Sequence, residues 1–248
     1  MTSSSHKTMV PPNLKPAVAR LWQRYYPTYD EAAFIGFVTG MVQTDMSVLE
    51  IGAGSGRGAQ AMFALKGLCE RYVGIDLDPR VLENPNLDEA YVCDADRLPF
   101  EDGRFDLVFH RFVAEHLQNP EQTFRESLRV LKPGGSIVFA TPNRLYYPMI
   151  LAQLTPTWVH EFLVAHLGTG RKSADVFPTF YRLNTKRRIK QSLGRLAPAA
   201  AVEIYRVSAP PGYLRKSPLL FALGILYERS FERVFPTLRA GLWTKITK

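Results

Sequence analysis

Apolar residues follow two different periods along this chain, and the change comes after its first fifth. Before that point, Leu14–Tyr25 and a stretch after Asp30, which is a candidate N-cap, carry apolar side chains at helical spacing. After it, short apolar runs alternate with helical patterns as far as the middle of the chain. The pattern predicts a helical flank over residues 1–46, followed by a domain over 47–248 that is built from βαβ units.

Several short apolar runs in the second region have the length and composition of buried strands. They are Ser47–Ala53, Tyr72–Leu77, Ala90–Asp94, Phe105–His110 and Ser136–Thr141. Helices are expected over Arg57–Lys66, closed by Gly67, and from Pro120 after the N-cap Asn119, with Leu131 at the buried end of that helix. Pro133–Gly135 is expected to form a turn. Strands that alternate with helices predict a mostly parallel sheet with helices on both faces.

Beyond the last of these strands the alternation loosens, and two segments have the length of insertions. They cover about 142–184 and 208–236, and each is too long for a plain connection. A basic helix over Thr185–Leu196 follows the first insertion, and Ala200–Val207 and Leu238–Thr247 would complete a seven-stranded sheet. We expect the N-terminal helices and the two insertions to form the substrate pocket.

The clearest chemical signal is a glycine-rich loop after the first expected strand. Gly52, Gly54 and Gly56 let the backbone turn sharply and let a ligand approach with no Cβ in the way. In open α/β sheets, ligands bind at this edge of the sheet. The dinucleotide fingerprint G-x-G-x-x-G is not met, because its third glycine would fall on Arg57. Glu50, inside the strand, would repel a pyrophosphate but would suit a ligand that carries an ammonium and a sulfonium.

This loop and four later segments together resemble the class I S-adenosylmethionine-dependent methyltransferase family, in its small-molecule branch. The matching segments follow the family's order from about Val48 to Asn143. They are Val48–Gly58, Val73–Asp78, Asp94–Phe100, Phe105–Arg111 and Arg129–Gly135. The resemblance implies a Rossmann-like α/β fold, S-adenosyl-L-methionine as the cofactor and methyl transfer as the activity.

The resemblance also implies which residues hold the cofactor. Glu50 and the glycine loop would contact its methionine part, and Asp76 would accept hydrogen bonds from both ribose hydroxyls. Asp94 would bind the adenine amino group, and Ala95 would offer a backbone N–H to the ring. The full expected set is Glu50, Gly52, Ala53, Gly54, Gly56, Asp76, Leu77, Asp94, Ala95, Asp96, His110 and Arg111.

Methyl transfer displaces a good leaving group, so alignment of the acceptor can supply much of the rate. An acceptor hydroxyl also needs a proton acceptor, and the residues after the fourth strand are the candidates. His110 is the expected base, with Arg111 and Glu115 as alternatives, whereas His116 is expected to support the next helix. Asn143 is expected either to contact the acceptor or to cap a turn.

No metal site is expected from the residue spacing. His160 and His166 are six residues apart, whereas a metal pair on one helix needs a separation of four. Asp106 falls within an expected strand. Cys69 and Cys93 lack the paired spacing of a zinc site or of a disulfide framework.

A net charge of +8 and a pI near 9.5 fit either an anionic partner or a mildly basic enzyme.

The segment 213–233 is apolar with basic residues at both ends. It is expected to lie in a membrane interface, to line a pocket for a lipid-like acceptor, to form a buried helix or to make a homodimer contact. The basic helix would be either a solvated face or a contact for phosphate or anionic lipid. No recognised nucleic-acid-binding motif is present, so nucleic acid is not expected as a partner.

We therefore expect methyl transfer from S-adenosyl-L-methionine to a small-molecule or lipid-linked acceptor, at oxygen. Two alternatives stay open: an NAD-dependent oxidoreductase, which Arg57 argues against, and a catalytically inactive cofactor-binding subunit that activates a partner.

Tyr25, Tyr26 and Tyr29 would close over the cofactor or pack in the core. No secretory signal and no bilayer-spanning apolar run are readable, so we expect a cytoplasmic protein, peripheral to a membrane if 213–233 contacts one.

Overall fold

The structure is a computed structural model, and it describes residues 11, 14–27, 32–57, 64–154 and 178–248. The chain divides into two compact units. The sheet unit comprises residues 32–142, 178–205 and 242–248, and the helical unit comprises residues 1–31, 143–177 and 206–241. Each unit therefore combines segments that lie far apart in the sequence.

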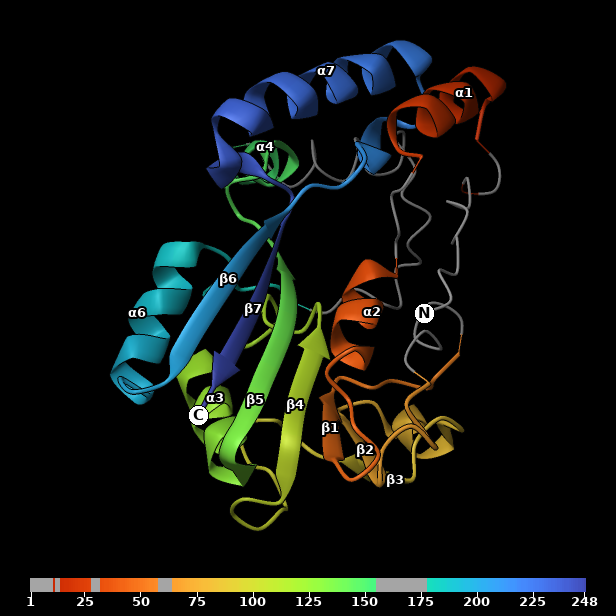
Figure 1. The fold of residues 1–248 in the computed structure, drawn as a ribbon. Helices are drawn as coiled ribbons and strands as arrows, with labels where there is room; N and C mark the ends of the chain where they lie inside the picture. The colour runs from red at the N-terminus through yellow and green to blue at the C-terminus, as the bar shows by residue number, and fades with distance from the viewer. Residues whose placement is uncertain (1–10, 12–13, 28–31, 58–63, 155–177) are drawn as a thin grey trace. The chain divides into compact units, whose positions relative to one another are not determined.

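The sheet has seven strands in the order β3-β2-β1-β4-β5-β7-β6 (Figure 1). Its strands are β1 (Ser47–Ile51), β2 (Arg71–Asp76), β3 (Glu89–Val92), β4 (Phe105–Arg111), β5 (Leu131–Pro142), β6 (Ala201–Val207) and β7 (Gly241–Thr247). The registers among β1 to β5 are all parallel. β7 runs against β5, because Lys248 N–H, just after β7, donates to Gly135 O near the start of β5 at 3.0 Å (Figure 1). The expected seven-stranded, mostly parallel sheet is confirmed.

Two apolar clusters cover the two faces of this sheet. α3 (Pro120–Val130) and α6 (Lys186–Leu196) contribute to one cluster, in which Phe124 is buried. α2 (Ala33–Thr39) contributes Val38 to the other. The strands between the clusters are therefore buried on both sides, which explains why they occur in the sequence as continuous apolar runs rather than as alternating patterns.

Two element boundaries differ from the expected ones. Leu131, expected at the buried end of a helix, instead begins β5, and Pro133–Gly135 lies inside that strand at a shift of register rather than in a turn. Gly134 has a φ of 78°, which is the left-handed conformation that a bulge of this kind uses. Lys66 forms an isolated bridge with Cys69, so the first expected helix does not extend to Lys66.

The ends of other elements follow the sequence signals more closely. α3 begins at Pro120 with Asn119 at the N-cap position, although the Asn119 side chain makes no capping bond. The last strand begins three residues later than expected, because Pro236–Leu238 form a 3-10 turn. The expected N-cap Asp30 and residues 58–63 of the first expected helix lie outside the described residues.

The helical unit contains α1 (Pro16–Tyr25), α4 (Tyr147–Leu154) and α7 (Pro218–Val234). α1 and α7 share one buried cluster, in which the rings of Trp22 and Phe221 stack with their centroids 6.0 Å apart. The expected N-terminal flank therefore contributes α1 to this unit and α2 to the sheet unit. Within the described ranges, none of the helices has both the length and the apolar character to cross a bilayer.

Truncation of a central ring tests how far the sheet unit depends on its core. Phe139 is fully buried, and its ring centroid lies 4.9 Å from that of His110 and 5.3 Å from that of Phe124. We expect Phe139→Ala to lower the free energy of unfolding by about 3–5 kcal/mol, because it removes buried surface and leaves a cavity. Urea unfolding followed by circular dichroism measures the loss. The exposed control Leu68→Ala should change it by less than about 0.5 kcal/mol, and equal losses in both variants would contradict the expectation.

Candidate cofactor site

The glycine loop after β1 has a backbone conformation that favours glycine. Gly52, Gly54 and Gly56 have φ angles of 76°, 54° and 64°. A Cβ on Gly52 would lie 2.5 Å from Val113 Cγ2, and one on Gly56 would lie 2.0 Å from Asn84 Oδ1. The chain's own neighbours therefore require at least two of these glycines before any ligand approaches.

Asp76 fastens this loop to the end of β2. Its carboxylate accepts hydrogen bonds from Gly54 N–H at 2.8 Å and from Asp78 N–H at 2.9 Å. The N–H of Gly52 donates to Ile75 O at 2.8 Å. The structure thus brings together the glycine loop and the acid that the sequence assigned to the same cofactor.

Two asparagines that sequence reasoning missed brace the loop from another side. Asn84 Nδ2 donates to the carbonyls of Ala53 and Gly54, both at 3.2 Å. Asn86 Nδ2 donates to the carbonyl of Gly56 at 3.3 Å. Their partners lie 30 or more residues away along the chain, so no local motif could have identified them.

Glu50 lies in β1 beside the loop, and its side chain is buried. The hydroxyl of Tyr72, on β2, donates a hydrogen bond to its carboxyl. Burial raises the pKa of Glu50 to about 8 and the charge of Asp76 adds to the rise, whereas the Tyr72 hydrogen bond and the Arg111 guanidinium oppose it. The group expected as an anion beside the loop is therefore mostly a neutral acid at pH 7 until a cation lies next to it.

The residues that follow β2 and β3 differ in what their side chains already contact. Leu77 and Asp94 are exposed, and Asp94 Oδ1 accepts from Asp96 N–H at 3.0 Å. Asp96 accepts a hydrogen bond from the Thr123 hydroxyl and so holds the first turn of α3. Ala95 is buried. Leu77 and Asp94 thus have side chains that a ligand could reach, whereas the carboxylate of Asp96 serves α3.

His110 lies in the core of the sheet unit. Its side chain is 2% exposed, and its ring stacks on that of Phe139. Burial lowers the pKa of His110 to about 3, and its Nδ1 has no hydrogen-bond partner among the described residues. An imidazole that is stacked on Phe139 and has so low a pKa does not support the expected role as a base.

Phe112, which sequence reasoning passed over, occupies the turn after β4. Its φ of 57° is left-handed, and bulky residues held in that conformation cluster at functional sites. Its side chain is 48% exposed, and the Arg111 guanidinium carbon lies 5.3 Å from the centre of its ring. Its N–H donates to Ala140 O at 2.9 Å, which ties the turn to β5. We therefore add Phe112 to the candidate residues at this edge of the sheet.

A buried polar row, made of Glu115, Thr141 and Asn184, joins the segment after β4 to the end of β5. Thr141 Oγ1 donates to Glu115 Oε2 at 3.2 Å and accepts from Asn184 Nδ2 at 2.6 Å. The three side chains are at most 5% exposed. Asn184 Oδ1 has no hydrogen-bond partner in the described part of the chain. His116, by contrast, contacts Pro178 O through Nδ1 at 2.9 Å, which is a structural contact.

The side chain of Asn143 hydrogen-bonds to the backbone segment that precedes β7. Its Nδ2 donates to Thr237 O at 2.8 Å and to Arg239 O at 2.7 Å, and its Oδ1 accepts from Leu145 N–H at 3.1 Å. Both amide hydrogens are in use, so this side chain has no N–H left for an acceptor. Of the two roles expected for Asn143, these contacts support the structural one.

The remaining candidates do not extend the site. Tyr26 donates to Glu228 within the helical unit. Tyr29, His160 and His166 lie outside the described residues. Over the ranges that the structure describes, no three His, Cys, Asp or Glu side chains are grouped as they would be around a metal ion.

Comparisons with known proteins point to the same region of the chain. A family model described as a methyltransferase domain matches residues 49–139. A probable S-adenosylmethionine-dependent methyltransferase from Mycolicibacterium smegmatis is 33% identical over 126 residues, which cover 48% of each chain. A ubiquinone/menaquinone biosynthesis C-methyltransferase from Laribacter hongkongensis is 30% identical over 119 residues, which cover 45% of this chain and 49% of that one. The chain spans about half the length of the curated relatives it matches.

A solved structure shows the same fold over more of the chain. Geranyl diphosphate C-methyltransferase from Streptomyces coelicolor has a TM-score of 0.53 and 17% sequence identity, covering 88% of this chain and 77% of that one. At this identity the likeness concerns the fold alone.

The buried acid of the site makes stability depend on pH. The ordinary pKa of a glutamate is 4.5, whereas burial raises the folded value for Glu50 to about 8. Between these values the folded state keeps a proton that the unfolded state has lost, so stability falls as the pH rises from about 4.5 to 8. We expect Glu50→Gln to remove this contribution, so that the Tm of the wild type falls relative to that of the variant between about pH 5 and pH 8. Thermal melts across this range measure the difference. Glu101→Gln, at an exposed acid, is the control, and parallel wild-type and Glu50→Gln profiles would contradict the expectation.

The motifs, the fold and the comparisons agree on the kind of domain that this part of the chain forms. The glycine loop of β1 and the acid that ends β2 meet through the Gly54–Asp76 hydrogen bond. The strand order supplies the expected fold, and the family model covers the segment from β1 into β5. Residues 49–139 match a methyltransferase domain, and the motifs and strand order around them resemble those of the class I S-adenosylmethionine-dependent methyltransferase family.

Proposed function

We propose that this chain transfers a methyl group from S-adenosyl-L-methionine to a small-molecule or lipid-linked acceptor. The observation that carries the proposal is the contact between the glycine loop and Asp76 at the carboxyl ends of β1 and β2, the edge where open α/β sheets bind ligands. When bound, the cofactor would supply a methyl group already activated on a sulfonium. The chain's own residues would then have to hold the two reactants in line and exclude water.

The residues at this edge fit the cofactor. Each carboxylate oxygen of Asp76 accepts one backbone N–H, which leaves lone pairs for the two ribose hydroxyls. Leu77, whose side chain is 63% exposed, would cover the adenine. Glu50 would lose its proton to pair with the cofactor's ammonium, which would offset the cost of burying its charge.

The two alternative functions make different demands on the same residues. A dinucleotide fingerprint needs glycine at position 57, where Arg57 instead lies 3.5 Å from Glu83. This departure disfavours an NAD-dependent oxidoreductase. A catalytically inactive subunit would bind the methyl donor but transfer nothing, so an activity measurement separates it from an enzyme.

We propose oxygen as the methylated atom, with Glu115 rather than His110 as the proton acceptor. A hydroxyl must lose its proton on methylation, and a positioned base raises the rate. Thr141, itself held by Asn184, fixes the orientation of the Glu115 carboxyl. Asn184 Oδ1, which has no hydrogen-bond partner among the described residues, is a second group that could accept a hydrogen bond from a hydroxyl. Burial keeps the pKa of His110 at about 3, so this imidazole would take up a proton too weakly at pH 7.

Carbon is a second candidate for the methylated atom. The Laribacter hongkongensis relative is named as a C-methyltransferase of ubiquinone and menaquinone biosynthesis. Methylation of an electron-rich ring carbon also ends with loss of a proton, so a proton acceptor in the polar row would serve either reaction. The methyl chemical shift of the product, measured with ¹³C-labelled donor, distinguishes an O-methyl from a C-methyl group.

Cofactor binding directly tests the role of the contact between the glycine loop and Asp76. We expect S-adenosylhomocysteine to bind with a Kd of roughly micromolar order, and Asp76→Ala to weaken binding at least about tenfold, because hydrogen bonds to a charged acceptor are lost. Asp76→Asn, which keeps an acceptor for Gly54 N–H, should lie between the two. Isothermal titration calorimetry measures all three, with Glu101→Ala as the exposed-acid control. Binding of NADH without binding of S-adenosylhomocysteine would overturn the proposal.

The polar row yields a separate prediction for turnover. With a phenolic, quinol or prenyl acceptor that accepts label from tritiated donor, we expect Glu115→Gln to lower kcat by about 100-fold or more and to flatten the pH profile. The affinity for S-adenosylhomocysteine should stay within about twofold. His110→Phe, which keeps an aromatic ring in the core, should retain activity within a few-fold. A full loss in His110→Phe beside an unchanged Glu115→Gln would assign the base to His110 instead.

A further inference from the structure

α7 leaves three leucines exposed on one face and buries both of its acids, beside Phe221 and Ile225, on the other. Leu219, Leu223 and Leu226 share one face of the helix by their spacing, and they are 70%, 52% and 61% exposed. The opposite face, which packs in the helical unit, contains Glu228 and Glu232, and both are buried. The exposed leucines and the buried acids both depart from the arrangement expected for a helix with its outer face in water.

The two buried acids are accommodated by hydrogen bonds inside the unit. Glu228 accepts from the hydroxyl of Tyr26, and Glu232 accepts from Ser208 Oγ at 2.6 Å. Burial raises the pKa of Glu228 to about 8 and also raises that of Glu232. The helix therefore has its acidic side chains in its interior and offers none of them on its outer face.

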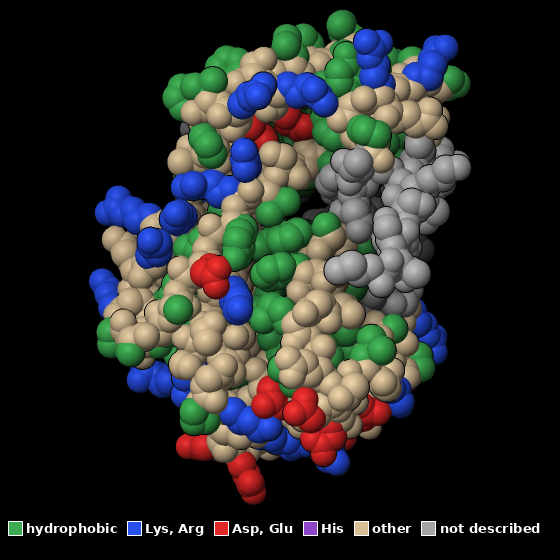
Figure 2. All heavy atoms as spheres, in the orientation of Figure 1, with side chains coloured by type: hydrophobic (Ala, Val, Ile, Leu, Met, Phe, Trp, Pro, Cys, Tyr) green, Lys and Arg blue, Asp and Glu red, His purple; other side chains and the backbone are tan. Residues whose placement is uncertain are grey.

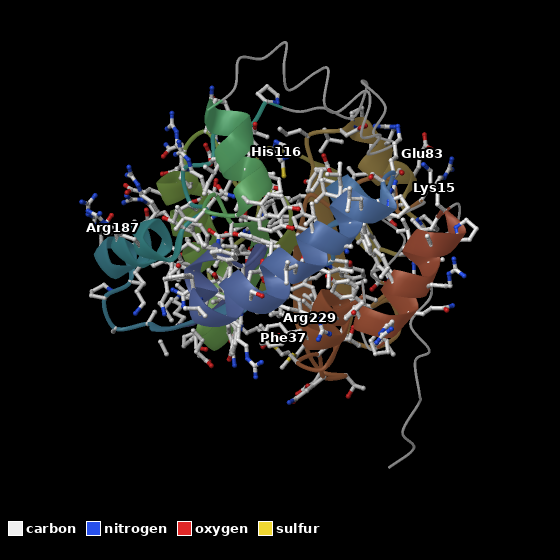
Figure 3. All side chains as sticks on the ribbon, turned by 90° about the horizontal axis from the view of Figure 1, so that it is seen from above. Lys15, Phe37, Glu83, His116, Arg187 and Arg229 are labelled. Carbon is white, nitrogen blue, oxygen red and sulfur yellow. The ribbon has the colours of Figure 1, made fainter. Side chains whose placement is uncertain are left out.

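Basic residues accompany the exposed leucines. Figure 2 shows hydrophobic and basic side chains next to one another over α7. Over the described residues of the helical unit, Glu228 and Glu232 are the only acids. The exposed basic residues of α7, of the turn before it and of α1 are Lys15, Arg20, Arg24, Lys216, Arg229 and Arg233. Figure 3 marks Arg229 on α7 and Lys15 at the start of α1. The surface thus combines apolar area with positive charge and lacks exposed negative charge among the described residues.

We propose that this α7 face docks on the surface of an anionic phospholipid bilayer, with the helix lying in the interface. Leucines would enter the boundary between headgroups and acyl chains, while the arginines and lysines would meet lipid phosphates. α7 is too short and too charged to cross the bilayer, so it would lie along it. This inference does not depend on the proposed methyl transfer.

A second copy of the chain is a poorer occupant of the same face. A twofold contact brings the same patch together on both copies. Here both patches would be basic, with no exposed acid among the described residues of the unit to pair with the arginines and lysines. An anionic bilayer offers an apolar region to the leucines and phosphates to the basic side chains.

Vesicle binding by the full chain tests the apolar part of the proposal. We expect co-sedimentation with phosphatidylcholine vesicles that contain phosphatidylglycerol, and much weaker binding to pure phosphatidylcholine. Leu219→Ser combined with Leu223→Ser should lower the partition coefficient at least about tenfold, because two side chains no longer enter the interface. Leu68→Ser, at an exposed leucine of the sheet unit, is the matched control and should bind like the wild type.

A charge variant tests the electrostatic part. Arg233→Gln should weaken binding to the anionic vesicles by about fivefold at low salt, and by less as salt is added. Arg187→Gln removes an equal charge from α6, whose Arg187 points outward in Figure 3, and should have a smaller effect. Equal losses in the two variants would mean that net charge alone attracts the chain to lipid, and would overturn the assignment to α7.

Two further outcomes would also overturn the proposal. One is unchanged vesicle binding by the double leucine variant, with folding verified by circular dichroism. The other is a wild-type dimer in light scattering that the leucine substitutions dissociate, together with no vesicle binding, which would assign the face to a second copy. Because S-adenosylhomocysteine titration is measured separately, failure of the docking proposal and failure of the proposed function are distinguishable.

Discussion

The candidate site depends first on the hydrogen bonds that hold the glycine loop against the end of β2. Gly52 N–H bonds to Ile75 O and Gly54 N–H bonds to the Asp76 carboxylate, so the loop takes this form only where β1 and β2 lie side by side in their parallel register. Loss of the carboxylate would leave a partly buried N–H without a partner, which costs free energy even when no ligand is bound. The acid that the sequence assigned to a cofactor therefore also holds the glycine loop in place.

The same arrangement occurs in both units: a buried carboxyl accepts a hydrogen bond from a tyrosine hydroxyl. Tyr72 donates to Glu50 in the sheet unit, and Tyr26 donates to Glu228 in the helical unit. Burial raises the pKa of both acids to about 8, so each is tolerated while protonated and costs stability once ionised. Beside the glycine loop, a cationic ligand could offset that cost, which would couple binding to ionisation. On α7, the hydrogen bond from Tyr26 holds Glu228 inside the unit, away from the outer surface.

Sequence reasoning succeeded where a feature depends on neighbouring residues, because the period of apolar side chains and the backbone freedom of glycine are local properties. It failed where a contact joins distant segments. Tyr72 and Asn84 act on partners 22 and about 30 residues away, and no spacing rule reports them. Position at a strand end suggested that His110 faces a ligand, but packing on Phe139 decides its orientation. Pro133–Gly135 has the composition of a turn, yet a register shift accommodates it within β5.

α7 is a different kind of case, because its period predicts a helix but not which face is buried. The structure buries Glu228 and leaves Leu223 and Leu226 outside. With its outer face in water, the helix would gain free energy from the reverse arrangement, since buried leucines stabilise a fold and a buried acid costs it stability. Hydrogen bonds from Tyr26 and Ser208 offset part of that cost, and contact of the outer face with a surface that is apolar and negatively charged would offset more. Arg233, exposed at the end of the helix, suits the second property, and a bilayer interface supplies both. The stability of α7 and its docking would then be coupled, so that lipid binding should raise the helical unit's resistance to unfolding.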